Sequence, residues 1–194
     1  MAASPGFLSP VDPERPLLVV ATPEEAEHLG IDLPVLITGI GRLNTATRLT
    51  EALVAGPRPT SLVNVGTAGS LTGVTGVHRI GTVVLHDFSH AAIAALAGAE
   101  AYPPITLDPS AATVLATGDA FIEDTATRAR LAQHADLVDM EGYAAAWVGQ
   151  HLGVPVTLIK LVSDTADADA GRLWIDGVAE CSRVLGSHLS TAVP

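Results

Sequence analysis

The sequence predicts a single α/β domain whose β-sheet is covered by helices on both faces. Its 194 residues are 48% hydrophobic, which is enough to bury one substantial core. Apolar runs of four to eight residues recur between turn signals, and several are followed by apolar positions at helical spacing. Continuous apolar strands that alternate with helices are typical of sheets buried on both sides. In such domains ligands bind beyond the carboxyl ends of the strands.

The apolar runs predict six strands, at residues 17–21, 34–41, 61–70, 80–88, 114–116 and 155–163. After the first strand, Thr22 is placed to cap a helix, with Pro23 at its first position and acidic residues in its first turn. Residues 42–55 have apolar positions at helical spacing, and another helix is expected from about Met140.

The limits of the domain follow from composition. Residues 1–16 are expected to be an N-terminal tail, and residues 17–190 to form the folded domain. The stretch 91–112 is rich in small residues and poorly periodic, so we expect a short helix and a loop there.

Composition excludes several classes of function. The formal net charge is −11 and no basic stretch occurs, so nucleic-acid binding is not expected. No apolar run approaches the roughly 18 residues of a membrane span. The single cysteine, Cys181, excludes an intrachain disulfide framework, and no apolar N-terminal signal segment is present. We therefore expect a cytoplasmic protein.

Four predicted strand ends carry unusual residues, at positions 24–25, 39–41, 66–69 and 163–164. The glycines among them let backbone amides approach a ligand closely. A Gly-x-Gly turn is, by itself, more often simply a tight turn. The further spaced glycine of the dinucleotide fingerprint is missing, and no lysine follows a glycine run as in a P-loop. The strand ends therefore mark a place for a site without identifying its ligand.

Acidic residues beside buried segments are a stronger signal. Asp139 and Glu141 precede the uncharged run GYAAAWV. Asp139 alone is explained equally well as a partner of the helix dipole. Glu141 leads into a buried face, where an unpaired carboxylate is unfavourable and a pair of ligand hydroxyls would satisfy it. Asp164 ends a buried strand and is either a helix cap or a ligand contact.

Seven motifs occur in collinear order: VVATPEEAEHL, TGIGRLNTATRLTEAL, VNVGTAGSL, IGTVVLHD, TGDAFI, VDMEGYAAA and VPVTLIKLVSDTAD. With them, residues 17–189 resemble the nucleoside phosphorylase and nucleosidase superfamily. The 5′-methylthioadenosine/S-adenosylhomocysteine nucleosidase branch is most similar, with futalosine hydrolase as a near relative. The resemblance implies a single-domain, phosphorylase/hydrolase-like three-layer fold with a central mixed β-sheet flanked by helices. It also implies cleavage of the N-glycosidic bond of a purine nucleoside through an oxocarbenium-like state.

By the same resemblance, three carboxylates carry the chemistry. Asp164 would protonate the leaving purine at N7, and Glu141 would bind the ribose hydroxyls and favour the cationic sugar. Glu25 would orient and deprotonate the attacking water. The choice of Glu25 over Glu24 rests on the spacing from the strand.

The resemblance further implies a substrate-binding set: Thr67, Ala68, Gly69, Phe121, Ile122, Met140, Lys160 and Ser163. Phe121 would stack on the purine, the backbone of Ile122 would read the base edge, and Met140 would pack on the ribose. Outside this motif, an isolated phenylalanine is usually an ordinary core residue. Thr67 and Lys160 stand where the family often has serine and arginine near the water.

Hydrolysis is expected rather than phosphorolysis. A phosphate site is normally built with arginine, and near these motifs only Arg42, next to the glycine turn, is available for one. The acidic Glu25 at the water position would repel phosphate. A phosphorylase, a futalosine-type hydrolase and a degenerate nucleoside-binding protein are the alternatives. The three carboxylates expected at one cleft argue against the nucleoside-binding protein, because a protein without turnover does not need them.

The segment 86–117 is shorter than the corresponding segment usually is in the family. In many members that segment contains a loop that contacts the substrate and part of the contact between subunits. His86, Asp87 and His90 either contact the 5′ substituent or lie on the surface. The histidines show no metal-ligand spacing, so no metal is expected, nor is a cofactor. The expected partners are a nucleoside, water and a second copy of the chain in a homodimer. The identity of the 5′ substituent stays open.

Overall fold

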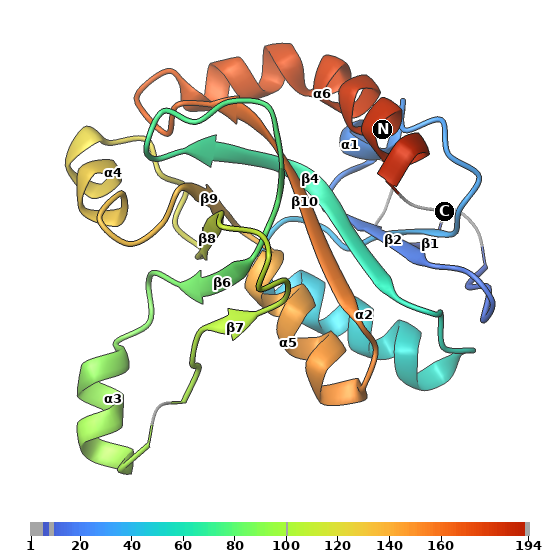
Figure 1. Ribbon diagram of the computed structural model, residues 1–194, viewed down its shortest axis with the longest axis horizontal. Helices are drawn as coiled ribbons and strands as arrows, with labels where there is room; N and C mark the ends of the chain where they lie inside the picture. Colours follow the sequence, from blue (N-terminus) through green and yellow to red (C-terminus); the bar gives the residue numbers. More distant parts are fainter. Residues whose placement is uncertain (1–5, 8–9, 100, 193–194) are drawn as a thin grey trace.

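The computed structural model of the protein describes residues 6–7, 10–99 and 101–192. Figure 1 shows one sheet with helices above and below it. The elements in chain order are β1 (Gly6–Phe7), β2 (Leu17–Val20), α1 (Pro23–Ala26), β3 (Val35–Ile37), α2 (Arg42–Ala55), β4 (Leu62–Ser70), β5 (Val77–Arg79), β6 (Thr82–Leu85), α3 (His90–Ala97), β7 (Ile105–Thr106), β8 (Val114–Thr117), α4 (Thr125–Leu131), β9 (Leu137–Asp139), α5 (Gly142–Leu152), β10 (Val156–Asp164) and α6 (Ala170–Ala192).

The sheet is mixed, as predicted. Its main path runs β1-β3-β2-β4-β9-β8-β6-β7, and β10 pairs with both β4 and β5. β4 and β10, nine residues each, run parallel through the centre, whereas β9 pairs antiparallel with β4. The ladder between β4 and β10 becomes irregular between Val162 and Asp164. Irregularities of this kind at a strand end re-aim the side chains that follow.

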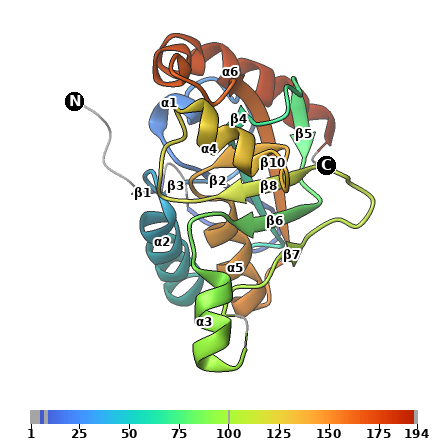
Figure 2. The same cartoon turned by 90° about the vertical axis from the view of Figure 1, so that its left-hand side faces the viewer.

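Helices cover both faces of this sheet. Figures 1 and 2 show α1 and α6 on one face and α2 and α5 on the other. The alternation along β2 explains this arrangement, because successive side chains of a strand point to opposite faces. Leu17 and Val19 belong to the core beneath α2 and α5, whereas Leu18 and Val20 belong to the core beneath α6. The predicted three-layer α/β architecture is confirmed.

All six expected strands are present, and the expected helix over residues 42–55 is α2. The second strand is shorter than predicted, since β3 ends at Ile37. Gly39 and Gly41 follow it with φ of 88° and 96°, a backbone conformation that ends an extended strand. β5, β7 and β9 are not predicted by the sequence analysis, because two or three residues carry too little pattern.

Part of the expected N-terminal tail is joined to the sheet. Gly6–Phe7 forms β1, which pairs antiparallel with β3, and Val11 packs against the core. Residues 1–5 and 8–9 of that tail lie outside the described residues, as do residues 193–194. The domain limits at 17 and 190 stay a prediction.

Residues 91–112 contain the expected short helix, α3, and then β7, which pairs with β6. Glu100, within this stretch, lies outside the described residues. None of the described helices is long and apolar enough to cross a membrane.

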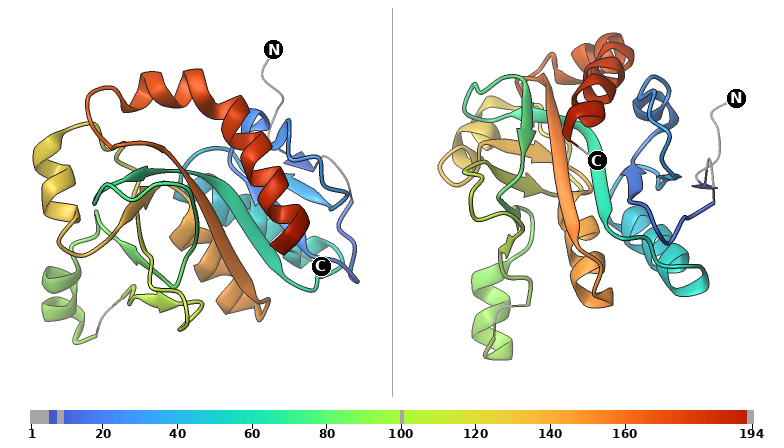
Figure 3. Two further views of the ribbon diagram at one scale, coloured as in Figure 1. Left: turned by 45° about the horizontal axis from the view of Figure 1, so that its top comes forward. Right: turned by 45° about the vertical axis from the view of Figure 1, so that its right-hand side comes forward.

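The longest helix, α6, lies across β4 and β10 (Figure 3). Leu185 and Leu189 are fully buried in the core beneath it. Gly186 lets the helix approach the segment after α1, because a Cβ at this position would lie 2.1 Å from the carbonyl oxygen of Leu29. Gly177, in the same helix, has open space around it.

We expect opposite effects from alanine at these two glycines. Gly186→Ala should lower the free energy of unfolding by about 1–3 kcal/mol, because the new methyl forces α6 away from the carbonyl of Leu29. Gly177→Ala should raise it by about 0.5–1 kcal/mol through helix propensity. Urea unfolding followed by circular dichroism measures both. A Gly186→Ala variant as stable as the wild type would contradict this account of the packing.

Candidate functional site

A cleft lies where β4 and β10 end, beside α1 and the starts of α5 and α6. It contains about 700 Å³ not filled by protein atoms, part of it open to solvent, which suits a small ligand. Its lining residues are Ala21, Thr22, Glu25, Ile40, Thr67, Ala68, Gly69, Ala120, Phe121, Ile122, Val138, Asp139, Met140, Glu141, Ser163, Asp164 and Trp174. Of the residues that the sequence analysis assigns to the site, all but Lys160 are in this set.

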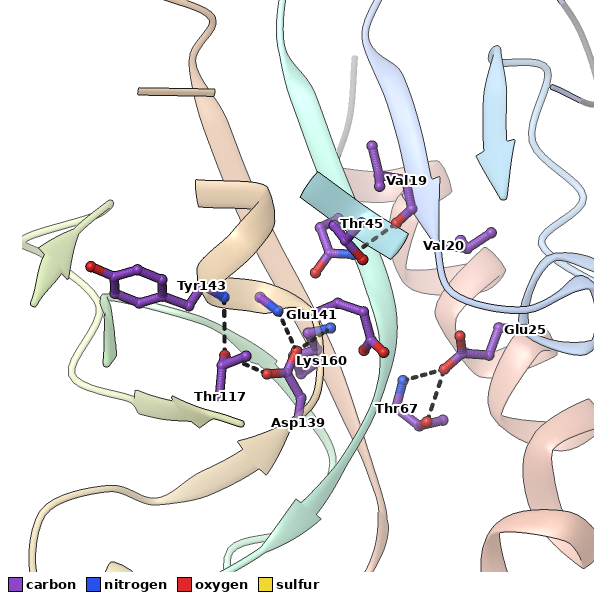
Figure 4. Close-up of polar contacts among 12 residues, drawn as sticks. Val19, Val20, Glu25, Thr45, Thr67, Thr117, Asp139, Glu141, Tyr143 and Lys160 are labelled. Atoms are coloured by element: carbon purple, nitrogen blue, oxygen red, sulfur yellow. Dashed lines mark hydrogen bonds and ion pairs between the residues drawn. The ribbon is translucent and has the colours of Figure 1, made fainter. Parts of the chain in front are cut away.

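Glu25 enters the cleft from α1. Thr22 caps this helix by accepting a hydrogen bond from the backbone N–H of Glu25, at 3.3 Å. The helix phase leaves Glu24 exposed and buries Glu25. Oε1 of Glu25 accepts hydrogen bonds from the backbone N–H and the hydroxyl of Thr67, at 2.8 and 2.9 Å (Figure 4). Oε2 is buried without a partner among the described residues, so it is available to a ligand or a water.

Glu141 stands immediately before α5 and is buried. Its Oε1 accepts a hydrogen bond of 2.8 Å from the backbone N–H of Gly41. Burial, followed by the negative charge of Asp139, raises the pKa of Glu141 to about 8, although the charge of Lys160 acts in the opposite direction. Polar partners from a ligand would stabilise the ionised form of this buried carboxyl group.

Lys160 lies behind the cleft wall, whereas the sequence analysis expected it to bind substrate. Its Nζ is 2.9 Å from Oδ2 of Asp139, and both side chains are 1% exposed. Burial lowers the pKa of Lys160, but the charges of Asp139 and Glu141 outweigh this effect and leave the pKa raised. A lysine inside a buried strand needs a carboxylate at its ammonium group, which explains why its side chain turns to Asp139.

Asp139 is fully engaged by the fold. Oδ1 accepts a hydrogen bond from the hydroxyl of Thr117 at 2.6 Å, and Oδ2 accepts one from the backbone N–H of Gly142 at 2.8 Å (Figure 4). Gly142 is the first residue of α5. These contacts support the interpretation of Asp139 as a partner of the helix start, rather than as a ligand contact.

Asp164 is the last residue of β10 and is buried at the cleft. Its Oδ2 accepts a hydrogen bond from the hydroxyl of Ser163, and its Oδ1 accepts one from the backbone N–H of Ala166, both at 2.8 Å. Ala166 has a φ of 50°, which is uncommon outside glycine. Since α6 begins only at Ala170, Asp164 does not cap it, and its carboxyl group is positioned as part of the cleft.

The loop that carries Phe121 is held from outside the cleft. Phe121 is 49% exposed, so it is not an ordinary core aromatic, whereas Ile122 is buried. Nε and Nη2 of Arg42 donate to Oδ2 of Asp119 at 3.0 and 2.8 Å, and Nη1 lies 2.8 Å from Oδ1 of Asp87. Two carboxylates therefore neutralise the guanidinium, and Arg42 does not line the cleft.

His86, Asp87 and His90 do not line the cleft either. Asp87 pairs with Arg42, and Nε2 of His90 lies 3.1 Å from the carbonyl oxygen of Leu85. Burial lowers the pKa of His86. In the part of the chain that the structure describes, no three His, Cys, Asp or Glu side chains are grouped as metal ligands would be.

Two prominent cleft residues have no assigned role in the sequence analysis. Trp174 comes from α6, and its Nε1–H donates to the hydroxyl oxygen of Thr67 at 2.8 Å. It lies in a stretch without a motif, so no sequence signal marks it. Ile40 is 49% exposed between the glycines at positions 39 and 41. The sequence analysis marks positions 39–41 as a strand end where a ligand site is expected, but it assigns no contact to Ile40.

Comparison with known proteins gives consistent matches. The phosphorylase superfamily matches residues 86–192. The 5′-methylthioadenosine/S-adenosylhomocysteine nucleosidase of Shewanella sediminis is 29% identical over 169 residues, with 73% of this chain and 72% of the relative covered. The enzyme of the same name from Shewanella baltica is 30% identical over 169 residues, with 73% and 70% covered.

Solved structures show the same fold. A mutant of the Helicobacter pylori 5′-methylthioadenosine/S-adenosylhomocysteine nucleosidase, with 5′-methylthioadenosine in its active site, superposes with a TM-score of 0.80 at 20% identity. This match covers 92% of this chain and 97% of the other. A mutant of Helicobacter pylori futalosine hydrolase gives a TM-score of 0.79 at 19% identity, with 91% and 97% covered.

The raised pKa of Glu141 predicts a pH dependence of stability. Below about pH 4.5, the ordinary pKa of a glutamate, the carboxyl group is protonated in both the folded and the unfolded protein. Its ionisation therefore does not change the free energy of unfolding there. As the pH rises toward 8, the unfolded state releases the proton and the folded state keeps it, so the folded protein loses stability. The Glu141→Gln variant does not lose stability in this way, because the amide of glutamine does not titrate. Its free energy of unfolding relative to the wild type should therefore increase between about pH 5 and pH 8, by on the order of a few kcal/mol.

Urea unfolding at a series of pH values measures this difference. Glu51→Gln, at an exposed position of α2, is the control, and its curve should run parallel to that of the wild type. A difference between Glu141→Gln and the wild type that does not change with pH would refute the assignment.

Proposed function

The chain belongs to the phosphorylase superfamily, and on that premise we propose that it is a purine nucleoside N-ribohydrolase. Its proposed substrate is an adenine-containing, 5′-modified nucleoside such as 5′-methylthioadenosine or S-adenosylhomocysteine. One observation carries the proposal. Three buried carboxyl groups, from Glu25, Glu141 and Asp164, line one cleft together with Asp139, which is already paired with Lys160. Among the residues that the structure describes, no arginine or lysine lines this cleft. The curated relatives of similar sequence are nucleosidases.

In the proposed reaction the C1′–N9 bond of the nucleoside breaks and a C1′–O bond to water forms. Asp164 gives a proton to N7 of the purine, which leaves as a neutral base. The hydroxyl of Ser163 and the backbone N–H of Ala166 hold the carboxyl group of Asp164 at the end of β10, which supports this role. Phe121, half-exposed in the cleft wall, stacks on the base beside Ile122.

Glu141 binds the ribose hydroxyls in this proposal. A buried carboxyl group with a pKa of about 8 is short of partners, and two sugar hydroxyls supply them. Hydrogen bonds from these hydroxyls favour the ionised form of Glu141, and its negative charge then favours the cationic character that the sugar acquires as the bond breaks. Met140, which lines the cleft beside it, packs on the sugar.

Glu25 accepts the proton of the attacking water. Its Oε2 is buried in the cleft without a partner, and Oε1 is fixed by Thr67. Water is favoured over phosphate because Arg42, the arginine nearest the cleft motifs, is already neutralised by Asp87 and Asp119. An anion would also meet the carboxylate of Glu25.

The proposed assembly is a homodimer. α3 carries no acidic residue, lysine or arginine and buries none of its residues, and Leu96 on it is 84% exposed. An apolar helix on the surface of an acidic protein favours contact with another protein surface. A cytoplasmic location stays a prediction.

Release of free adenine from 5′-methylthioadenosine tests the reaction. We expect release at the same rate, within about twofold, with and without inorganic phosphate, and a free sugar as the second product. The two rates follow from liquid chromatography of the base. Strict dependence on phosphate would indicate a phosphorylase. No release from 5′-methylthioadenosine, S-adenosylhomocysteine or futalosine would favour a nucleoside-binding protein without turnover.

The general acid is tested by Asp164→Asn. The amide keeps the shape of the side chain but cannot donate an acidic proton, so kcat should fall by about 10²- to 10⁴-fold. Asp169→Asn, an exposed position five residues later, is the matched control and should keep kcat within about twofold. Near-normal turnover by Asp164→Asn, with unchanged circular dichroism, would remove Asp164 from this role.

A further inference from the structure

A series of hydrogen bonds leads from α6 to Glu25. Nε1 of Trp174 is 2.8 Å from Oγ1 of Thr67, and this oxygen is 2.9 Å from Oε1 of Glu25. An indole N–H can only donate and a carboxylate can only accept, so the direction of both bonds is fixed. The indole donates to the hydroxyl oxygen, and the hydroxyl hydrogen points to Glu25. Hydrogen bonds in series polarise one another, which strengthens the second bond.

The same helix holds the backbone of Glu25 separately. The hydroxyl of Ser182, which is fully buried in α6, donates to the carbonyl oxygen of Glu25 at 2.8 Å. It also accepts a hydrogen bond of 2.9 Å from the backbone N–H of His28. Loss of the indole N–H therefore leaves the docking of α1 on α6 in place.

The two oxygens of Glu25 have different surroundings as a result. Oε1 accepts two hydrogen bonds from Thr67, whereas Oε2 is buried and has no partner among the described residues. Rotation of the carboxylate away from this orientation would break the two hydrogen bonds of Oε1. The hydroxyl of Thr67 opposes that rotation only while its hydrogen points to Glu25, and the indole N–H enforces this orientation.

We propose that Trp174 is a positioning residue for the carboxylate that activates water. Its N–H orients the hydroxyl of Thr67, which holds Glu25 with Oε2 available in the cleft, while its ring forms part of the cleft wall. The inference rests on the proposed function, since it assigns a purpose to the geometry of Glu25.

Trp174→Phe tests the proposal, because phenylalanine keeps an aromatic ring and removes the N–H donor. We expect kcat for 5′-methylthioadenosine to fall about threefold to tenfold, the range that one neutral hydrogen bond spans, with KM changed by less than about twofold. Trp147→Phe is the control, since Trp147 packs against Tyr143 and His151 outside the cleft, and its kcat should stay within about twofold of the wild type. An unchanged kcat in Trp174→Phe, or a rise in KM alone, overturns the proposal.

A double-mutant cycle separates this role from a general structural one. Thr67→Val removes the hydroxyl, so Trp174→Phe should lower kcat no further in that background. Thr67→Ser keeps the hydroxyl, and Trp174→Phe should act there as it does in the wild type. If Trp174→Phe lowers kcat in the Thr67→Val variant by the same factor as in the wild type, the indole does not act through Thr67.

A spectroscopic measurement separates failure of this inference from failure of the proposed function. The chain has two tryptophans, and ¹⁵N-labelled protein gives one indole N–H signal from each. The Trp174 signal, identified by its loss in Trp174→Phe, should move in Thr67→Val and in Glu25→Gln, while that of Trp147 stays in place. A stationary Trp174 signal overturns the hydrogen-bond series whether or not the protein cleaves a nucleoside. A shifted signal in a protein that releases no base contradicts the function and leaves the series standing.

Discussion

The ion pair between Lys160 and Asp139 is the interaction on which the site depends. It joins the middle of β10 to the end of β9 in a region where both side chains are 1% exposed. Removal of either partner would leave a buried charge unpaired, which typically costs about 3–5 kcal/mol. Asp139 also receives the first backbone N–H of α5 and the hydroxyl of Thr117, which in turn accepts from the backbone N–H of Tyr143. One carboxylate thus ties β8, β9, β10 and α5 together directly beneath the cleft.

This arrangement also sets the electrostatics of the cleft. The positive charge of Lys160 lies behind the wall and offsets Asp139, so Glu141 and Glu25 face the ligand space with only partial compensation. Such a cavity favours a neutral ligand that becomes cationic and disfavours an anion. Asp87 and Asp119 pair with Arg42 outside the cleft and neutralise its charge. The proposed preference for water over phosphate therefore depends on the carboxylates that neutralise Lys160 and Arg42, as much as on which residues line the cleft.

Much of the fold is predictable from local patterns, because α2 has apolar positions at helical spacing and β4 and β10 follow long, largely apolar runs. The choice of Glu25 over Glu24 agrees with the burial that the phase of α1 produces. Lys160 was misplaced because a family position does not reveal which neighbour a side chain turns to, and its partner Asp139 is distant in sequence. No sequence pattern marks Trp174, because its hydrogen bond to Thr67 arises only from packing of α6 on β4. Strand order and two- or three-residue strands such as β7 also depend on contacts that no short window of sequence contains.

Helix α6 holds Glu25 both directly, through Ser182, and indirectly, through Trp174 and Thr67, and this affects how the site folds. The hydrogen bond of Trp174 to Thr67 spans 107 positions of the chain, and that of Ser182 to Glu25 spans 157. Contacts of such separation are non-local, and non-local contacts slow folding. During synthesis, which proceeds from the N-terminus, Glu25 emerges 157 positions before Ser182, the residue that holds its backbone. A folding intermediate with an intact central sheet but an undocked α6 would be compact and inactive.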